Sequence, residues 1–217
     1  ALDLAVAALR EFERHSVPHL GENGLPVHIT ACAGVALVRS HAPFYRAYRA
    51  AKMLCSSAKS ARREAREEGG WLDWMVGMFL SAQSVEEWRE AYRAGHPRLT
   101  MRPYPVTGRV NRRSWDWLDL EVLGPGPQTQ RAQGFRGDPA WRYSRNRVKQ
   151  LEWLVREGAD AVRKQLSVWR ATQPDLRLPG GLGEGGVVDS NTPLVDAIEI
   201  MDLHLRLEPS TPEAGTR

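Results

Sequence analysis

The sequence predicts an α/β domain followed by a mainly helical extension. Between residues 27 and 104, apolar runs typical of buried strands alternate with helical patterns in the order strand, helix, strand, helix, strand, which indicates a layered α/β unit. Beyond residue 106, apolar residues recur at helical spacing between Gly- and Pro-rich loops, so helices should dominate there. We therefore divide the chain into an α/β part, a helical extension and a disordered tail: 1–106, 107–207 and 208–217.

The α/β part opens with an amphipathic helix at residues 1–15. The strand that follows, 27–38, is too continuously apolar and β-branched for a surface position, so we expect it inside a sheet. A long helix is predicted at 43–67, because Pro43 needs no amide hydrogen bond at a first helical position. A Gly-Gly pair ends this helix.

A second strand, apolar on both faces, is predicted at 71–80, and a third at 98–104, closed by two prolines. A short helix capped by Ser84 lies between them. In the extension, two Gly-rich loops at 124–137 and 174–190 separate the helical patterns. The helices expected there are 111–123, 139–156, 159–171 and 192–204.

Composition describes an ordinary globular chain of 217 residues, 42% hydrophobic, with a net charge of +4. No apolar run approaches the roughly 20 residues that a membrane span requires, and no signal peptide opens the chain. The two cysteines lack metal-ligand spacing, so we expect small buried thiols in a reducing cytoplasm and no zinc. Basic residues are in excess between 98 and 170, which favours a phosphate or an acidic partner there; solvated arginines are the alternative.

The long predicted helix carries two contrasting faces. Its apolar face is formed by residues three and four apart: Phe44, Ala47, Tyr48, Ala51, Leu54, Cys55 and Ala58. Another face lines up cations with one serine: Arg49, Lys52, Ser56, Lys59 and Arg63. A buried strand that leads into a helix with an ordered row of cations indicates an anionic ligand.

Several motifs occur in an order that resembles one protein family. The strand segment Ala31–Ala36 and the Ala58-Lys59 pair on the next helix resemble the rear half of a GGDEF-type palm domain. Further motifs in the same order are Asp73 in the second strand, Leu99–Pro105, Trp141–Lys149 and Thr192–Asp202. Together they resemble the second palm domain and C-terminal helical extension of the large polymerase–cyclase subunit of type III CRISPR effectors, and its stand-alone bacterial relatives. The resemblance covers most of residues 1–205.

This resemblance implies the rear part of a ferredoxin-like palm sheet that binds ATP or another nucleotide triphosphate. Such palms join nucleotides with Mg²⁺ or Mn²⁺, and in effector complexes they make cyclic oligoadenylate for antiviral defence. Their metal-binding carboxylates lie in a Gly-Gly-Asp-Asp or Gly-Gly-Asp-Glu hairpin, which is absent upstream of the first helix here. Two-metal chemistry needs clustered acids, so we expect no catalytic residue and no metal ligand in this chain. Because it also lacks an initiator Met, we interpret it as a truncated protein that is inactive alone; a degenerate palm is the alternative.

The same resemblance points to nucleotide-binding residues. Lys59 and Arg63 match the basic residues that contact the triphosphate tail in GGDEF-type cyclases, and cations one helical turn apart offset phosphate charge. Lys52 lies earlier on the same stripe, and Gly34 permits close backbone approach. Cys32 departs from the family, where Ser is common, and a thiol is a poor hydrogen-bond partner. The alternatives are a solvated helix face for the cations and helix packing for Gly34.

A second basic face suggests a different function. Arg142, Arg145, Lys149 and Arg156 share one side of the predicted helix 139–156, which suits RNA or an acidic effector-complex subunit. A non-catalytic RNA- or protein-docking module is therefore the second hypothesis, and a solvated face is the alternative for these cations.

Other polar and aromatic features are interpreted as structural. Asp196, Glu199 and Asp202 are predicted to form an exposed acidic face opposite a buried apolar stripe; a cation site is the alternative. Most tryptophans are predicted to be core anchors and not stacking platforms. The Gly-rich segment Gly180–Gly186 lacks the strand and the Lys-Ser/Thr of a phosphate loop. The histidines are scattered, without catalytic or metal spacing.

Overall fold

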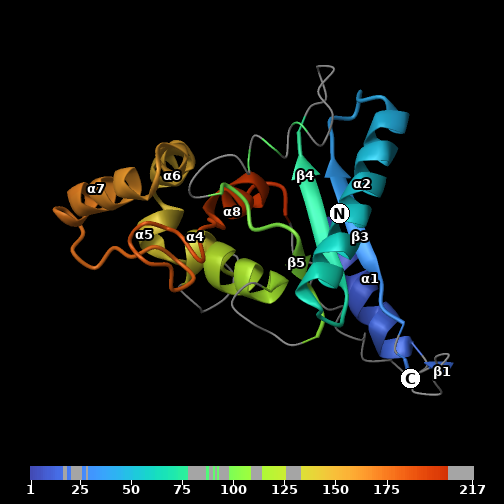
Figure 1. Cartoon of the computed structure of the whole chain (residues 1–217). Helices are drawn as coiled ribbons and strands as arrows, with labels where there is room; N and C mark the ends of the chain where they lie inside the picture. The colour runs from blue at the N-terminus through green and yellow to red at the C-terminus, as the bar shows by residue number, and fades with distance from the viewer. Residues whose placement is uncertain are drawn as a thin grey trace, which may run out of the picture.

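The structure is a computed structural model, and it describes most of the chain. The described residues are 1–16, 19–20, 26–27, 29–77, 87, 90, 92, 98–108, 114–125 and 133–204. A small sheet with two long helices forms one side of the molecule, and the shorter helices gather on the other (Figure 1). The architecture is therefore mixed α/β, as the sequence predicts. Among the described residues, no helix combines the length and the apolar character needed to cross a membrane.

The principal sheet has three strands in the order β3-β4-β5. Strands β3 (Cys32–Leu37) and β4 (Trp71–Val76) are parallel, with Gly34 opposite Asp73, and β5 (Tyr104–Pro105) pairs antiparallel with β4. Parallel neighbours need a crossover connection, which helix α2 provides. A separate antiparallel pair is formed by β1 (His19–Leu20) and β2 (Pro26–Val27).

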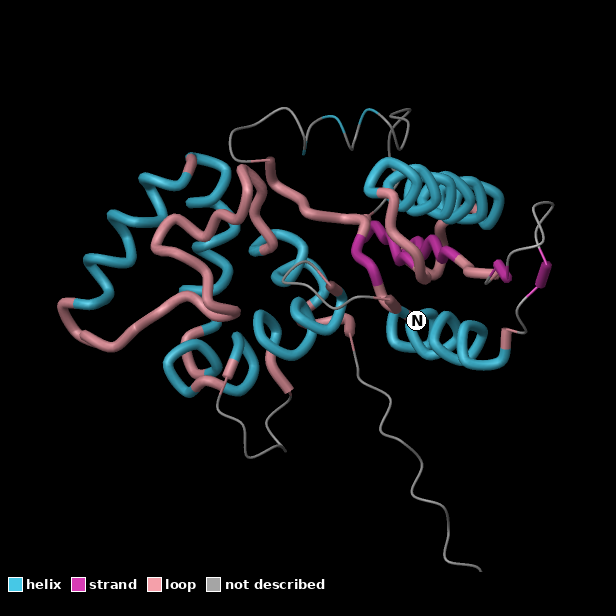
Figure 2. Tube along the Cα trace, turned by 60° about the horizontal axis from the view of Figure 1, so that its bottom comes forward, coloured by secondary structure: helices cyan, strands magenta, loops and turns pink. Residues whose placement is uncertain are grey.

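The two long helices cover opposite faces of the sheet (Figure 2). Helix α1 (Leu2–His15) buries Leu2, Val6 and Leu9 in the same core as Leu72 and Trp74 of β4. Helix α2 (Phe44–Ala65) buries Ala50 and Leu54 against Met75. Because side chains alternate along a strand, successive residues of β4 serve the two helices in turn. This explains why β4 is apolar on both faces.

The helical part packs against the α1 face of the sheet through one continuous hydrophobic core. It begins with η1 (Trp117–Leu123), a π-type helix. The remaining helices are α4 (Gly134–Gly137), α5 (Pro139–Arg142), α6 (Arg145–Glu157), α7 (Ala159–Arg170) and α8 (Leu194–Ile200). Among the described tryptophans, six are buried, as predicted: Trp71, Trp74, Trp115, Trp117, Trp141 and Trp169. The seventh described tryptophan, Trp153 on α6, is 70% exposed.

Three predicted elements differ from the structure. The third strand, expected at 98–104, is reduced to β5, because Thr100 and Met101 donate hydrogen bonds to Asp196 of α8 instead of to a strand. Residues 134–137, expected in a loop, form α4. The helix expected at 139–156 is two helices, because Ser144 leaves the helical conformation (φ −125°, ψ 54°) between α5 and α6.

The first predicted strand, 27–38, is shorter in the structure: β3 spans Cys32–Leu37, and residues 29–31 and 38 are not in a strand. The sequence predicts a position inside a sheet, but among the described strands β3 is an edge of the three-stranded sheet, and its residues are half-buried. Ser84 lies outside the described residues, as do 78–80 at the end of the second predicted strand and the predicted tail, 208–217.

The buried face of α2 is the predicted one in part, because Leu54 and Ala58 are buried and Ala47, Ala51 and Cys55 are half-buried. Its centre is Ala50, Leu54 and Ala58, each at most 1% exposed. Phe44 and Tyr48, predicted on the apolar face, are 82% and 60% exposed. The small side chains at the centre let the helix approach the sheet closely, whereas two aromatic rings would hold it away.

Candidate phosphate-binding surface

The cations of α2 lie on the face of the helix that points away from the sheet. Arg49, Lys52, Lys59 and Arg63 are all exposed, and their spacing places them within one sector of a helix with about 3.6 residues per turn. The basic face of α2 is defined here by these four residues. It is the stripe that the sequence predicts.

No ion pair within the described part of the chain includes a cation of α2. The helix itself contains no carboxylate before Glu64. By contrast, the other helices pair many of their cations: Arg14 with Glu11, Arg145 with Asp202, Arg156 with Glu152, Arg163 with Asp160 and Arg170 with Glu184. The basic face of α2 therefore keeps its positive charge available to an external anion.

Gly34 determines how closely α2 sits on the sheet. A β-carbon at Gly34 would lie 2.2 Å from the carbonyl oxygen of Ala51 and 2.3 Å from the amide nitrogen of Cys55. The space on that side of Gly34 is thus filled by the backbone of α2, which corresponds to the packing alternative for this glycine. Close approach of this kind is a common reason for glycine within a strand.

Polar contacts hold the last turn and the middle of α2 in place. Arg62 points inward and donates a hydrogen bond to the hydroxyl of Thr30. The thiol of Cys55 donates to the carbonyl of Cys32 at 3.3 Å, and both cysteines are free and half-buried. These contacts tie α2 to the start of β3 and to the segment before it, so the outward direction of the basic face is held by the fold.

A buried charged cluster joins the sheet to α8, and the sequence interpretation missed it. Asp196 is fully buried and accepts hydrogen bonds from Thr100 Oγ1 (2.8 Å), the Met101 amide (2.8 Å) and Tyr104 Oη (2.9 Å). The predicted exposed acidic face is therefore wrong for Asp196. A helix-face argument cannot detect this, because the donors come from a distant segment of the chain.

Arg102 is the cationic centre of that cluster. Its Nη2 lies 2.9 Å from Glu199 Oε2, its Nη1 donates to the Trp74 carbonyl at 2.9 Å, and its guanidinium lies 5.1 Å from the centre of the Trp74 ring. Burial of the guanidinium lowers the pKa of Arg102. The negative charges of Asp196 and Glu199 outweigh this effect, so the pKa of Arg102 is raised above its ordinary value. Burial also raises the pKa of Glu199, which accepts a further hydrogen bond from Tyr92 at 2.9 Å. The charged side chains of the cluster are paired and hydrogen-bonded within the protein, so we interpret the cluster as structural.

A cleft of about 400 Å³ lies between α1 and η1. Its polar lining includes Arg10, Asp116 and Asp119. Arg10 forms an ion pair with Asp116, and the carboxylate of Asp119 lies 3.1 Å from Nε2 of the buried His204. Each of these three side chains already has a charged or polar partner within the protein, so the cleft offers a weaker case for a ligand than the basic face of α2.

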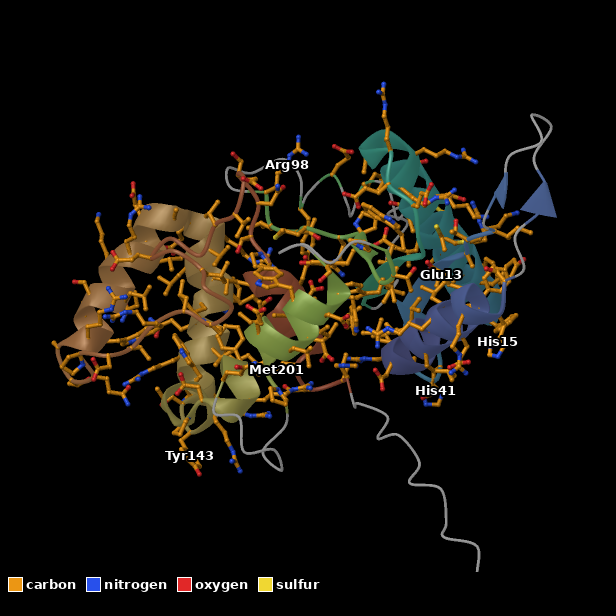
Figure 3. The ribbon with its side chains drawn as sticks, turned by 90° about the horizontal axis from the view of Figure 1, so that it is seen from below. Glu13, His15, His41, Arg98, Tyr143 and Met201 are labelled. Carbon is orange, nitrogen blue, oxygen red and sulfur yellow. The ribbon has the colours of Figure 1, made fainter. Side chains whose placement is uncertain are left out.

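The second predicted basic face is divided in the structure. Arg142 belongs to α5, and its guanidinium lies 5.3 Å from the centre of the ring of Tyr143. Tyr143 lies at the outer edge of the helical part (Figure 3). Arg145 and Lys149 lie together on α6, but Asp202 is 2.7 Å and 3.7 Å from them. Asp202 therefore already offsets the charge of Arg145 and Lys149, two of the side chains expected to bind RNA.

Comparison with known proteins does not assign the chain to a family. The chain matches no model of a known protein family and no curated protein sequence. Within the described residues, no group of three or more His, Cys, Asp or Glu side chains is arranged to hold a metal ion.

Proposed function

We propose that this chain is the nucleotide-binding part of a palm-type nucleotidyltransferase or cyclase-like protein of prokaryotic antiviral defence, similar to the large subunit of type III CRISPR effectors. In this proposal the basic face of α2 holds the phosphates of ATP or a related triphosphate. The observation that carries it is the row of exposed α2 cations with no ion-pair partner in the described part of the chain.

Lys59 and Arg63 are the central phosphate contacts of the proposal. They are four residues apart, so their α-carbons are separated by about 6 Å along the helix axis, a distance that neighbouring phosphates of one tail can bridge. Lys52 lies two turns earlier and can meet the remainder of the nucleotide. Gly34 contributes indirectly, because it lets α2 sit flat on β3 and thereby orients the row.

Metal-dependent nucleotide joining would need carboxylates that the described residues do not provide as a cluster. The residues shown here would bind and orient phosphates, and Mg²⁺ or Mn²⁺ ligands would have to come from elsewhere in the intact protein.

The alternative, an RNA- or protein-docking module that uses Arg142, Arg145 and Lys149, has less support. Asp202 offsets the charge of two of these residues, and an anionic partner would have to compete with it. No comparable carboxylate contacts the basic face of α2 within the described residues.

Titration of the full-length protein with ATP, with and without Mg²⁺, tests the proposal. A hydrogen bond to a charged group contributes about 1.5–3 kcal/mol, so Lys59→Ala should weaken ATP binding by about 10- to 100-fold. Lys164→Ala, which removes an exposed lysine from α7, is the matched control and should bind as the parent protein does. Unchanged ATP affinity in Lys59→Ala would reject the assignment.

A further inference from the structure

Three large aromatic side chains are exposed at the start of α2. Phe44 is 82% exposed, Tyr45 58% and Tyr48 60%. Scattered exposed apolar residues are ordinary, but a contiguous exposed group usually marks a binding surface. Two of the rings are nearly parallel: the ring centres of Phe44 and Tyr48 are 6.5 Å apart, and the ring planes are inclined by 24°.

These aromatic residues lie on the same side of α2 as the basic face. Phe44, Tyr48, Lys52 and Lys59 follow at steps of four, four and seven residues, which keeps them within one sector of the helix. Ser56 and the remaining cations of the basic face complete that sector. A single exposed surface therefore changes from aromatic at its first turns to cationic towards its end.

The length of this surface exceeds what one nucleotide can use. From Phe44 to Arg63 the helix advances about 28 Å, whereas the proposed nucleotide contacts lie between Lys52 and Arg63, over about 17 Å of that length. A ligand that reaches both ends must offer flat rings at one end and phosphates along its whole length. A single-stranded nucleic acid has that chemistry, because bases stack on aromatic rings while the backbone follows cations.

We propose that the exposed face of α2 binds a single-stranded oligonucleotide, with bases stacked on Phe44 and Tyr48 and the backbone along Arg49, Lys52 and Lys59. This inference rests on the proposed function, since it extends the same phosphate surface from one nucleotide to a strand. An anionic membrane is the main competing occupant. A membrane-surface helix, however, carries apolar residues along its length, whereas here they are confined to the first turns.

Fluorescence anisotropy with the full-length protein tests the inference, using a labelled single-stranded RNA of mixed sequence, about 12 nucleotides long. Phe44→Ala and Tyr48→Ala should each weaken RNA binding by about 5- to 100-fold and leave ATP affinity unchanged, because stacking is lost and the phosphate contacts remain. Lys59→Ala should weaken the binding of both RNA and ATP. Tyr143→Ala removes another exposed aromatic ring beside an arginine and should change neither.

The outcomes separate the two proposals. RNA affinity that is unchanged in both aromatic variants, while Lys59→Ala still weakens ATP, would overturn this inference and leave the proposed function in place. ATP affinity that is unchanged in Lys59→Ala would overturn the proposed function instead. Binding to vesicles rich in anionic lipid, lost in the aromatic variants and without RNA binding, would assign the surface to a membrane and also overturn the inference.

Discussion

Nε of Arg102 lies 2.7 Å from Oδ1 of Asp196, and the two side chains are only 3% and 0% exposed. Arg102 precedes β5, and Asp196 is on α8, so this ion pair joins the sheet side of the molecule to the helical side. The other polar atoms of the two side chains have hydrogen-bond partners of their own, as a buried pair requires. The pair therefore makes the packing of α8 dependent on the segment before β5.

Replacement of Arg102 by Met should strongly destabilise the protein. The substitution keeps much of the side-chain volume but leaves the carboxylate of Asp196 buried without its cation, which costs about 3–5 kcal/mol. Urea unfolding followed by circular dichroism should show a lower transition midpoint. Arg98→Met is the control, because Arg98 is exposed (Figure 3) and contributes backbone hydrogen bonds that the substitution retains; equal losses in the two variants would contradict the role of Arg102.

Gly34→Ala should destabilise the contact between α2 and the sheet. The added β-carbon would meet the α2 backbone at 2.2 Å, and backbone cannot move aside as a flexible side chain does, so we expect a loss of about 2–3 kcal/mol or more. Thermal unfolding measures the effect. Gly77→Ala, at the end of β4, introduces the same methyl group where no atom lies within 4 Å; a similar loss there would show that the effect is not due to the approach of α2.

Stability should depend on pH through Glu199. Burial raises its pKa above the ordinary value of 4.5, so the folded protein binds this proton more tightly than the unfolded chain does. The contribution of Glu199 is fully present below pH 4.5 and is lost as the pH rises through the raised pKa. The unfolding free energy of the parent protein minus that of Glu199→Gln, measured across this range, should fall with increasing pH; a value that rises with pH would contradict the shift.

Removal of Asp202 should have little effect on stability. Its ion pairs with Arg145 and Lys149 are at the surface, where such pairs typically contribute about 0–1 kcal/mol.

The same substitution also tests RNA binding. If Arg145 and Lys149 bind RNA, Asp202→Ala should strengthen RNA binding by removing the carboxylate that pairs with them, and Arg145→Ala should weaken it. On the proposal for α2, neither variant changes RNA affinity, and anisotropy with the same labelled RNA distinguishes the two expectations.

Much of the α2 surface could be predicted from the sequence because helical spacing is a local property. The positions of Lys52, Lys59 and Arg63 on one exposed face follow from the recurrence of small apolar residues on the other. The exposure of Phe44 and Tyr48 could not be predicted in the same way. Aromatic residues at helical spacing look like core, and only the close approach at Gly34 shows that small residues occupy the contact.

The charged residues of α8 show the opposite case. By spacing, Asp196, Glu199 and Asp202 form one acidic face, yet Asp196 is buried, Glu199 is nearly so, and Asp202 remains at the surface. The chain supplies Arg102 to the first two and Arg145 to the third. A sequence pattern records which groups share a helix face, but not which distant groups meet them.

By itself, the sequence determined the β3–α2–β4 unit and the helices α7 and α8 of the extension, because apolar periodicity over short stretches decides what each segment can bury. Tertiary structure decided which charges are neutralised. The energy of a charge depends on burial and on partners brought close in space, and for Arg102 and Asp196 those partners arrive only when α8 packs beside the sheet.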